Sequence, residues 1–210
     1  MKVNVQTEFF TESGSAVEGF RYEPEFISRE IELSLIESVR ALPFTAFKFH
    51  AFTANRRTVS FGWKYDYDQE RALAADPIPP FLLGIREQAS VLARIDPDSL
   101  QQISIIEYPP GAGIGWHRDK RVFGDVIGIS LLSPCRLRLR RQAGSGWERV
   151  SVTAQPRSLY ILSGPARHEW EHSIPAVDTL RYSIILRAAG PDTGSQPGQA
   201  AALPHSRTNP

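Results

Sequence analysis

Cysteine is almost absent from this chain: Cys135 is the single one among 210 residues. An internal disulfide framework is therefore excluded, and the scarcity suits a reducing compartment, so we expect a cytoplasmic protein. No apolar run approaches the roughly 20 residues of a membrane span. The N-terminus also lacks the basic-then-apolar pattern of a signal peptide. With a net charge of only +1, any nucleic-acid surface must be a local patch.

The composition that is present describes an ordinary globular domain. Hydrophobic residues make up 41% and charged residues 22% of the chain. Its length suits one well-buried core, and the sequence contains no repeats. We expect an irregular lead-in over residues 1–19, a single domain over residues 20–189 and a monomer. Residues 190–210 are rich in Gly, Pro, Ser and Ala, which predicts a disordered tail.

Helix signals come early in the chain and strand signals later. Ser28 is a good N-cap for a helix over residues 29–42, and the Pro-rich run 77–80 precedes a second helix that reaches about Ala93. In the first helix one face is apolar, with Ile31, Leu35, Val39 and Leu42. Strands are predicted over about 102–108, 126–132, 135–141, 148–153, 158–162 and 180–188. This order predicts an α+β fold whose N-terminal helices pack on one sheet of a jelly-roll-like core.

Residues 44–68 are aromatic and β-branched, with Asn55-Arg56-Arg57 as an interruption. The pattern predicts a hairpin that turns at this tripeptide, with a second strand from Thr58 to Tyr67. Aromatic and basic side chains alternate along it. Two interpretations stay open: the aromatics are the core of a half-buried strand, or they offer flat faces to nucleic-acid bases.

His117 and Asp119 carry the clearest chemical signal. On a strand, residues i and i+2 project from the same face, so the imidazole and the carboxylate would converge. Such a pair is half of a metal site. A distant histidine, His168 or His172, would complete the two-histidine, one-carboxylate triad of non-haem Fe(II) oxygenases. The alternatives are an ordinary surface pair and a zinc site of a hydrolase.

Together with residues 163–175 and 180–187, this motif resembles the AlkB family of Fe(II)- and 2-oxoglutarate-dependent dioxygenases. The likeness covers roughly residues 20–188. It rests on His117-x-Asp119, the distal His172, Arg181 and Arg187 six residues apart, and Tyr108 nine residues before the first histidine. The resemblance implies a double-stranded β-helix and Fe(II) bound by His117, Asp119 and His172. The Trp-x-His-x-Ile-Pro context selects His172, and we interpret His168 as a neighbour of the metal site or of the substrate.

The resemblance also implies a site for 2-oxoglutarate, which such enzymes use together with O2. Arg181 and Tyr108 would bind its distal carboxylate, since the planar guanidinium matches a carboxylate well. Arg187 would bind nearer the metal end of the cosubstrate and belong to the catalytic set with the three ligands. Ser183 lies between the two arginines on the same strand face, where the family often has Asn, and would also contact the cosubstrate. A zinc hydrolase would have no evident use for this arginine pair.

The function implied by the resemblance is oxidative demethylation of N-alkylated bases in DNA or RNA, with release of formaldehyde, succinate and CO2. Residues 44–70 would form a nucleotide-recognition lid, in which the substrate residues would be Trp63, Arg56, Arg57 and Tyr65. Arginines at 136, 138 and 140 alternate with leucines, which indicates either a solvated face or a phosphate-contacting ridge.

Two other functions stay open. One is an oxygenase of the same scaffold that acts on protein or a small molecule. The near-neutral charge favours it, as does Ile106, which stands where nucleic-acid repair members typically carry Asn. The other is a non-catalytic binding module with a decayed metal site.

Overall fold

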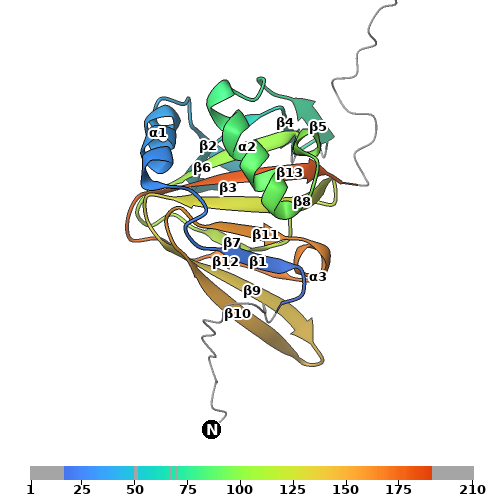
Figure 1. The fold of residues 1–210 in the computed structure, drawn as a ribbon. Helices are drawn as coiled ribbons and strands as arrows, with labels where there is room; N and C mark the ends of the chain where they lie inside the picture. Colours follow the sequence, from blue (N-terminus) through green and yellow to red (C-terminus); the bar gives the residue numbers. More distant parts are fainter. Residues whose placement is uncertain (1–16, 50–51, 67, 70, 191–210) are drawn as a thin grey trace, which may run out of the picture.

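A computed structural model describes residues 17–49, 52–66, 68–69 and 71–190. The predicted lead-in and tail lie outside these residues, apart from residues 17–19 and 190. Two antiparallel sheets carry most of the described chain, with the two long helices stacked on one of them (Figure 1). This arrangement confirms the predicted jelly-roll double sheet with helices on one side. Among the described residues, no helix combines the length and the apolar character that crossing a bilayer requires.

The sheets are built from strands that are far apart in the sequence. In spatial order, the large sheet contains β1 (Phe20–Glu23), β11 (Leu159–Leu162), β8 (Phe123–Leu131), β13 (Arg181–Ala189), β6 (Gln102–Tyr108), β3 (Phe52–Phe61) and β2 (Thr45–Phe49). The small sheet contains β10 (Gly146–Ala154), β9 (Cys135–Ala143), β12 (Glu171–Ile174) and β7 (Ile114–His117). A separate ribbon pairs β4 (Trp63–Asp66) with β5 (Arg71–Ala74).

Successive side chains along the strands of the large sheet point to opposite faces and contribute to two separate apolar cores. Ile105 and Ile184 belong to the apolar cluster under the helices α1 (Arg29–Arg40) and α2 (Pro80–Ala93). Their strand neighbours Ile106 and Ile185 belong to the cluster between the two sheets. The second cluster is the one that matters for function, because the candidate site lies at the end of the space between the sheets.

Both predicted helices are confirmed, with one change in the buried face. The Ser28 side chain accepts a hydrogen bond from the backbone N–H of Ile31, as an N-cap should. Ile31 itself is 38% exposed, and Glu32 is buried in its place. Burial of this carboxylate is tolerated because it accepts from the backbone N–H of Leu132 at 2.9 Å and pairs with Arg157 at 3.4 Å.

The predicted hairpin turn at residues 55–57 is wrong, because Asn55, Arg56 and Arg57 lie inside β3. Arg57 is held on both sides: it stands opposite Ala46 of β2 and opposite Glu107 of β6, and it donates to the Glu107 carboxylate at 2.7 Å. The strand ends instead at Gly62, which has a φ of +77°. A Cβ there would lie 2.0 Å from the carbonyl oxygen of Gln101, so both the conformation and the close approach require glycine.

Four strands and one α-helix were not predicted. The strands β1, β5, β7 and β12 have only four residues each, too few for alternation to identify them. The short helix α3 (Gly164–His168) follows Ser163 as its N-cap and has proline in its first turn. It ends before His172, so His168 and His172 do not share a helical face.

Candidate metal centre and adjoining cavity

The two histidines of the candidate triad come from neighbouring strands of the small sheet. His117 at the end of β7 stands opposite His172 of β12, and their ring centroids are 4.2 Å apart. Asp119 follows β7 by two residues. One potential ligand atom from each of the three side chains lies within 4.8 Å of the other two. The predicted convergence is confirmed, although strand pairing as well as the i, i+2 spacing brings it about.

The electrostatics of the triad favour the protonation states that bind a metal. Burial alone would raise the pKa of Asp119, but the charge of Arg187, helped by both histidines, outweighs it and holds the pKa well below the usual range. Burial, followed by the charge of His117, lowers the pKa of His172 to about 3. At neutral pH the site therefore presents a carboxylate and a neutral imidazole, the forms that coordinate metals.

The His117 ring is oriented by its own strand. Its Nδ1 lies 2.9 Å from the carbonyl oxygen of Gly115. Because a carbonyl oxygen only accepts, this contact requires the proton on Nδ1 and leaves Nε2 for a metal. His168 lies outside the triad, at the end of α3, where its backbone carbonyl accepts from Arg118 at 3.3 Å.

Arg167, which the sequence reasoning missed, holds the loop that follows Asp119. Its side chain is buried, with the residue 4% exposed. Its Nε donates to the carbonyl of Gly124 at 2.8 Å, and its Nη2 donates to those of Lys120 and Phe123, both at 2.7 Å. The guanidinium thus connects α3 to the loop that carries the carboxylate ligand. The only signal in the sequence was an arginine shortly before His172.

We expect Arg167→Lys to weaken metal binding about tenfold and to lower the melting temperature. A lysine ammonium cannot reach three diverging carbonyls with the geometry of a guanidinium, and each unpaired buried carbonyl costs about 1–3 kcal/mol. Titration with Mn(II), followed by calorimetry, and thermal melting measure the two effects. The matched control is Arg29→Lys in the exposed first turn of α1. Unchanged Mn(II) affinity in Arg167→Lys would contradict the positioning role.

A second group of polar side chains lies deeper between the sheets, around Arg181. This residue is 1% exposed and stands opposite Tyr108, whose ring lies 4.9 Å from the guanidinium. Its Nη2 donates to Ser130 Oγ at 3.0 Å. Among the described residues, Arg181 Nε and Nη1 and Ser183 Oγ have no hydrogen-bond partner. Burying donors and charge in this way is costly unless an anion pairs with them, so the group fits a carboxylate ligand.

Arg187 connects the two groups. Its Nε and Nη2 each lie 3.4 Å from an oxygen of Asp119, and its Nη1 donates to Gln102 at 3.0 Å. Phe123 supports it from the side, with the ring centroid 4.7 Å from the guanidinium carbon. Arg181 and Arg187 lie on the same face of β13, and the charges of both guanidinium groups act on the Tyr108 hydroxyl, so the carboxylate-sized site and the triad share the space between the sheets.

A cavity of about 680 Å³ opens beside the triad. Residues of β2, β3, β4, β6 and β7 line it, and so do Asp119 and Arg187. Two of the predicted substrate residues, Arg56 and Tyr65, are among the lining residues. Phe47 lies beside Arg56, with its ring 4.1 Å from the guanidinium, and was not predicted.

The structure does not bring the other two predicted substrate residues to the cavity. Trp63 is 7% exposed and stacks on Phe123, with ring centroids 4.8 Å apart and planes at 13°. Arg57 is the strand neighbour of Arg56, so its side chain leaves the opposite face of β3, where it pairs with Glu107. Trp63 therefore has a structural role under the cavity wall.

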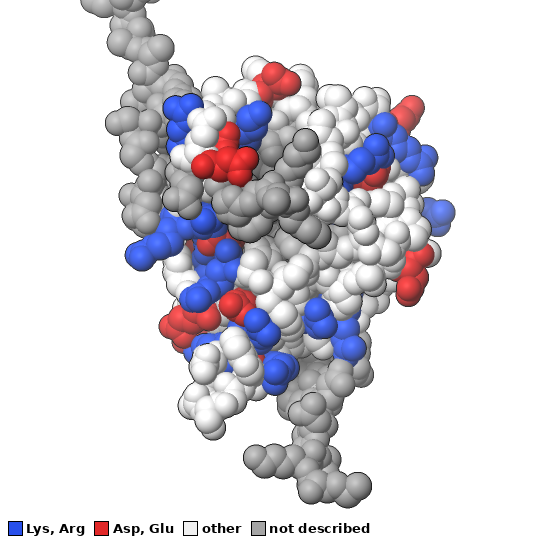
Figure 2. Space-filling view, turned by 180° about the vertical axis from the view of Figure 1, so that it is seen from behind, with Lys and Arg blue, Asp and Glu red and all other residues white. Residues whose placement is uncertain are grey.

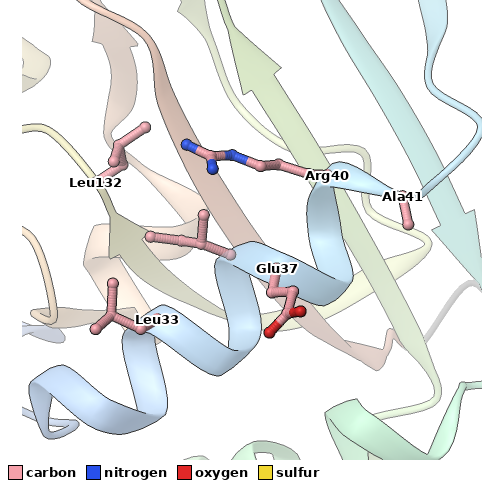
Figure 3. Close-up of a pocket in the computed structure, with 6 residues that line it drawn as sticks. Leu33, Glu37, Arg40, Ala41 and Leu132 are labelled. Carbon is pink, nitrogen blue, oxygen red and sulfur yellow. The ribbon is translucent and has the colours of Figure 1, made fainter.

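Another hollow lies beside α1, away from this site (Figure 3). It is lined by Leu33, Ile36, Glu37, Arg40, Ala41 and Leu132. Figure 3 shows Arg40 extending toward Leu132, and Leu33 is 57% exposed. With one carboxylate and no histidine, this hollow lacks the donor set of a metal centre.

Comparison with known proteins agrees with this geometry. Residues 19–209 match the 2OG-Fe(II) oxygenase superfamily. The alkylated DNA repair protein ALKBH8 homolog of Arabidopsis thaliana is 28% identical over 194 residues, which cover 79% of this chain and 54% of that protein. The tRNA (carboxymethyluridine(34)-5-O)-methyltransferase ALKBH8 of Mus musculus is 30% identical over 169 residues, 76% of this chain and 25% of that protein.

The chain spans about half or less of the length of these two relatives, 54% and 25%. The fold has a counterpart among solved structures. The structure of OsALKBH1 is similar with a TM-score of 0.62 at 13% sequence identity, over 81% of this chain and 96% of that one.

Proposed function

Since this chain belongs to the 2OG-Fe(II) oxygenase superfamily and is an AlkB homologue that uses Fe(II) and 2-oxoglutarate, we propose that it oxidatively demethylates N-alkylated bases of DNA or RNA. The cavity beside the triad carries the proposal, because its wall combines cations with aromatic rings. The names of the two relatives, one an alkylated DNA repair protein and one a tRNA methyltransferase, support a nucleic acid as the substrate class.

In this proposal, each polar group between the sheets has a defined task. His117, Asp119 and His172 hold Fe(II). The unpartnered donors of Arg181 and the hydroxyl of Ser183 bind the distal carboxylate of 2-oxoglutarate, with Tyr108 beside them.

Arg187 completes the catalytic set by orienting the Asp119 carboxylate and placing positive charge at the metal end of the cosubstrate. When bound, Fe(II), 2-oxoglutarate and O2 would supply the oxidation of a C–H bond next to nitrogen to C–OH, coupled to the conversion of 2-oxoglutarate to succinate and CO2. The hydroxymethylated base then releases formaldehyde.

The substrate side of the cavity offers contacts for a base and its phosphates. Tyr65 presents an aromatic ring, and the Lys120 ammonium lies 5.8 Å from its centroid. Arg56 stacks on Phe47 at the same opening. A base extracted from its strand could stack on Tyr65 while the cations meet phosphates. We therefore assign the base-contacting role to Tyr65, and to Arg56 a contact with the phosphate backbone of the nucleic acid.

Formaldehyde release from N-methylated oligonucleotides tests the proposed function. The enzyme, loaded with Fe(II) and 2-oxoglutarate, should release formaldehyde in proportion to the methylated base consumed in at least one DNA or RNA of the series. The same oligonucleotides without the methyl group are the control. Succinate formation without formaldehyde from any of them would contradict the proposal.

Replacements at Tyr65 and Trp63 should distinguish a residue that contacts the base from one that supports the cavity wall. Tyr65→Ala is expected to weaken binding of a methylated oligonucleotide about tenfold, because base stacking is worth about 1–3 kcal/mol. Its melting temperature and basal 2-oxoglutarate turnover should stay unchanged, and Tyr65→Phe should retain binding. Trp63→Ala should lower stability by about 3–5 kcal/mol and reduce basal turnover with it, since a buried ring is lost. If Tyr65→Ala binds as tightly as the wild type, Tyr65 does not touch the base.

A second candidate is an oxygenase of the same scaffold that acts on a basic segment of protein. Asp66 and Asp68 line the cavity opening, where they would repel phosphates and attract lysine or arginine side chains. Ile106 also lines the cavity and leaves an apolar surface there. A basic peptide that stimulates succinate formation, when no methylated oligonucleotide does, would establish this alternative.

A further inference from the structure

We propose that the outer face of the small sheet binds the phosphodiester backbone of a single-stranded nucleic acid and leads it to the cavity. This inference deepens the proposed function and rests on it for the identity of the partner. The surface, called the arginine face below, consists of Trp116 of β7, Arg138 and Arg140 of β9, and Trp147 and Arg149 of β10.

Strand register puts these side chains together on the side away from the core. Their neighbours Leu137 and Leu139 are 1% and 0% exposed in the core between the sheets, so Arg138 and Arg140 project outward. Arg140 stands directly opposite Arg149. Like charges opposite each other on one face of a sheet are destabilising; because Glu171 offsets only one of these two charges, an anion bound beside Arg149 would remove the remaining cost.

Indole rings hold the guanidinium groups in place. The Trp116 ring lies 4.9 Å from the guanidinium of Arg138 and 4.4 Å from that of Arg140. Arg140 also lies 4.1 Å from the Trp147 ring, which is 39% exposed. Cation–π stacking of this kind reduces the rotamer freedom that binding would otherwise remove. The exposed indole adds a surface on which an unpaired base can stack.

Neighbouring carboxylates leave the face with excess positive charge. Glu171 pairs with Arg140 at 2.6 Å. Glu148 and Glu169 are both engaged by Arg141, which is not part of the face. Figure 2 shows basic side chains, with acidic ones among them, gathered over the lower part of the molecule around the β9–β10 hairpin. The three arginines of the face therefore exceed the one carboxylate that pairs with them, as a polyanion requires.

The arginine face is continuous with the cavity. β7 is the outermost strand of the small sheet, and Trp116 both stacks with the arginines and lines the cavity. Arg118 lines it two residues further on. A strand that crosses the face thus meets the cavity opening at β7. Single strands fit better than duplexes, because their bases can stack on the indole and enter the cavity without loss of base pairs.

The test measures binding of a fluorescent oligothymidylate of about 12 nucleotides by anisotropy at several salt concentrations. Arg138→Gln/Arg149→Gln should raise Kd about tenfold and flatten the plot of log K against log salt by about 1.4, since each lost phosphate contact on a single strand contributes about 0.7. Arg149→Gln alone should give about half of that change in slope, without disturbing the 3.1 Å bond from Arg138 to Ser173.

The matched control is Arg29→Gln/Arg94→Gln, which removes the same charge from exposed positions at the ends of the two helices. This control should bind as the wild type does, and every variant should retain basal 2-oxoglutarate turnover. Equal Kd and equal slope in the wild type and the arginine-face variants would overturn the inference. So would loss of polyglutamate binding as large as the loss of oligonucleotide binding, since the face would then select acidic peptides equally.

Failure of the inference and failure of the proposed function give different results. If formaldehyde is released from a methylated oligonucleotide but the arginine-face variants bind it unchanged, the function stands and the docking surface is elsewhere. If those variants lose oligonucleotide binding while no methylated base yields formaldehyde, the docking surface stands and the demethylase proposal falls.

Discussion

Replacement of His172 by alanine is expected to abolish 2-oxoglutarate turnover while the protein remains folded. His172 provides one of three ligand atoms within 4.8 Å of one another, and the two remaining ligands would bind Fe(II) too weakly for turnover. The fold should survive because β12 pairs with β7 and β9 through its backbone, which the replacement leaves intact, and because His172 is only partly buried. Succinate formation, Mn(II) titration and thermal melting measure the three parts of this expectation.

His168→Ala is the matched control for His172→Ala. The two histidines are four residues apart, but His168 ends α3 and lies outside the triad. Its variant should therefore bind Mn(II) with the affinity of the wild type. A His168→Ala protein that lost metal, beside a His172→Ala protein that retained it, would show that the ligands have been assigned to the wrong histidine.

Arg181→Lys should reduce the affinity for 2-oxoglutarate at least tenfold, about 1.4 kcal/mol. Lysine keeps the charge but lacks the planar guanidinium group, whose Nε and Nη1 are buried without a hydrogen-bond partner in Arg181. The Michaelis constant for 2-oxoglutarate measures the effect in turnover. A second, independent measure is the rise in melting temperature on addition of 2-oxoglutarate, which should be large for the wild type and small for the variant.

Ser130→Ala is the control for this replacement. It removes the hydroxyl that accepts from Arg181 Nη2 at 3.0 Å and keeps the two unpartnered donors, so the loss should be smaller. An unchanged Michaelis constant in Arg181→Lys would move the carboxylate site elsewhere, with Arg187 as the next candidate.

The metal centre could be predicted from the sequence, because its signal is local in two short stretches. His117-x-Asp119 and the context of His172 are each contained within a few residues. Arg181, Ser183 and Arg187 lie in the strand β13, as their spacing predicts. The double sheet could be predicted for a similar reason, since its longer strands carry enough residues to show a pattern. The strands of four residues are too short to show such a pattern.

The substrate side could not be predicted, because its geometry depends on contacts distant in sequence. Gly62 interrupts the strand, so which of Trp63 and Tyr65 meets the cavity depends on packing against Phe123. Whether Arg56 or Arg57 does so depends on the register of β3 against β6. Arg167 carried no recognisable motif, since its partners are carbonyl groups of the loop 120–124.

Because His117 lies on an outermost strand, a bound metal would stabilise the attachment of that strand to the sheet. β7 has four residues and pairs only with β12 in the described sheet, and the bond from metal to His117 and His172 would join the two strands a second time. Removal of the metal by a chelator would therefore speed amide hydrogen exchange first in residues 114–117. Exchange in the large sheet would be affected only later. Because Trp116 belongs to the same strand and lines the cavity, loss of the metal would also loosen this part of the cavity wall.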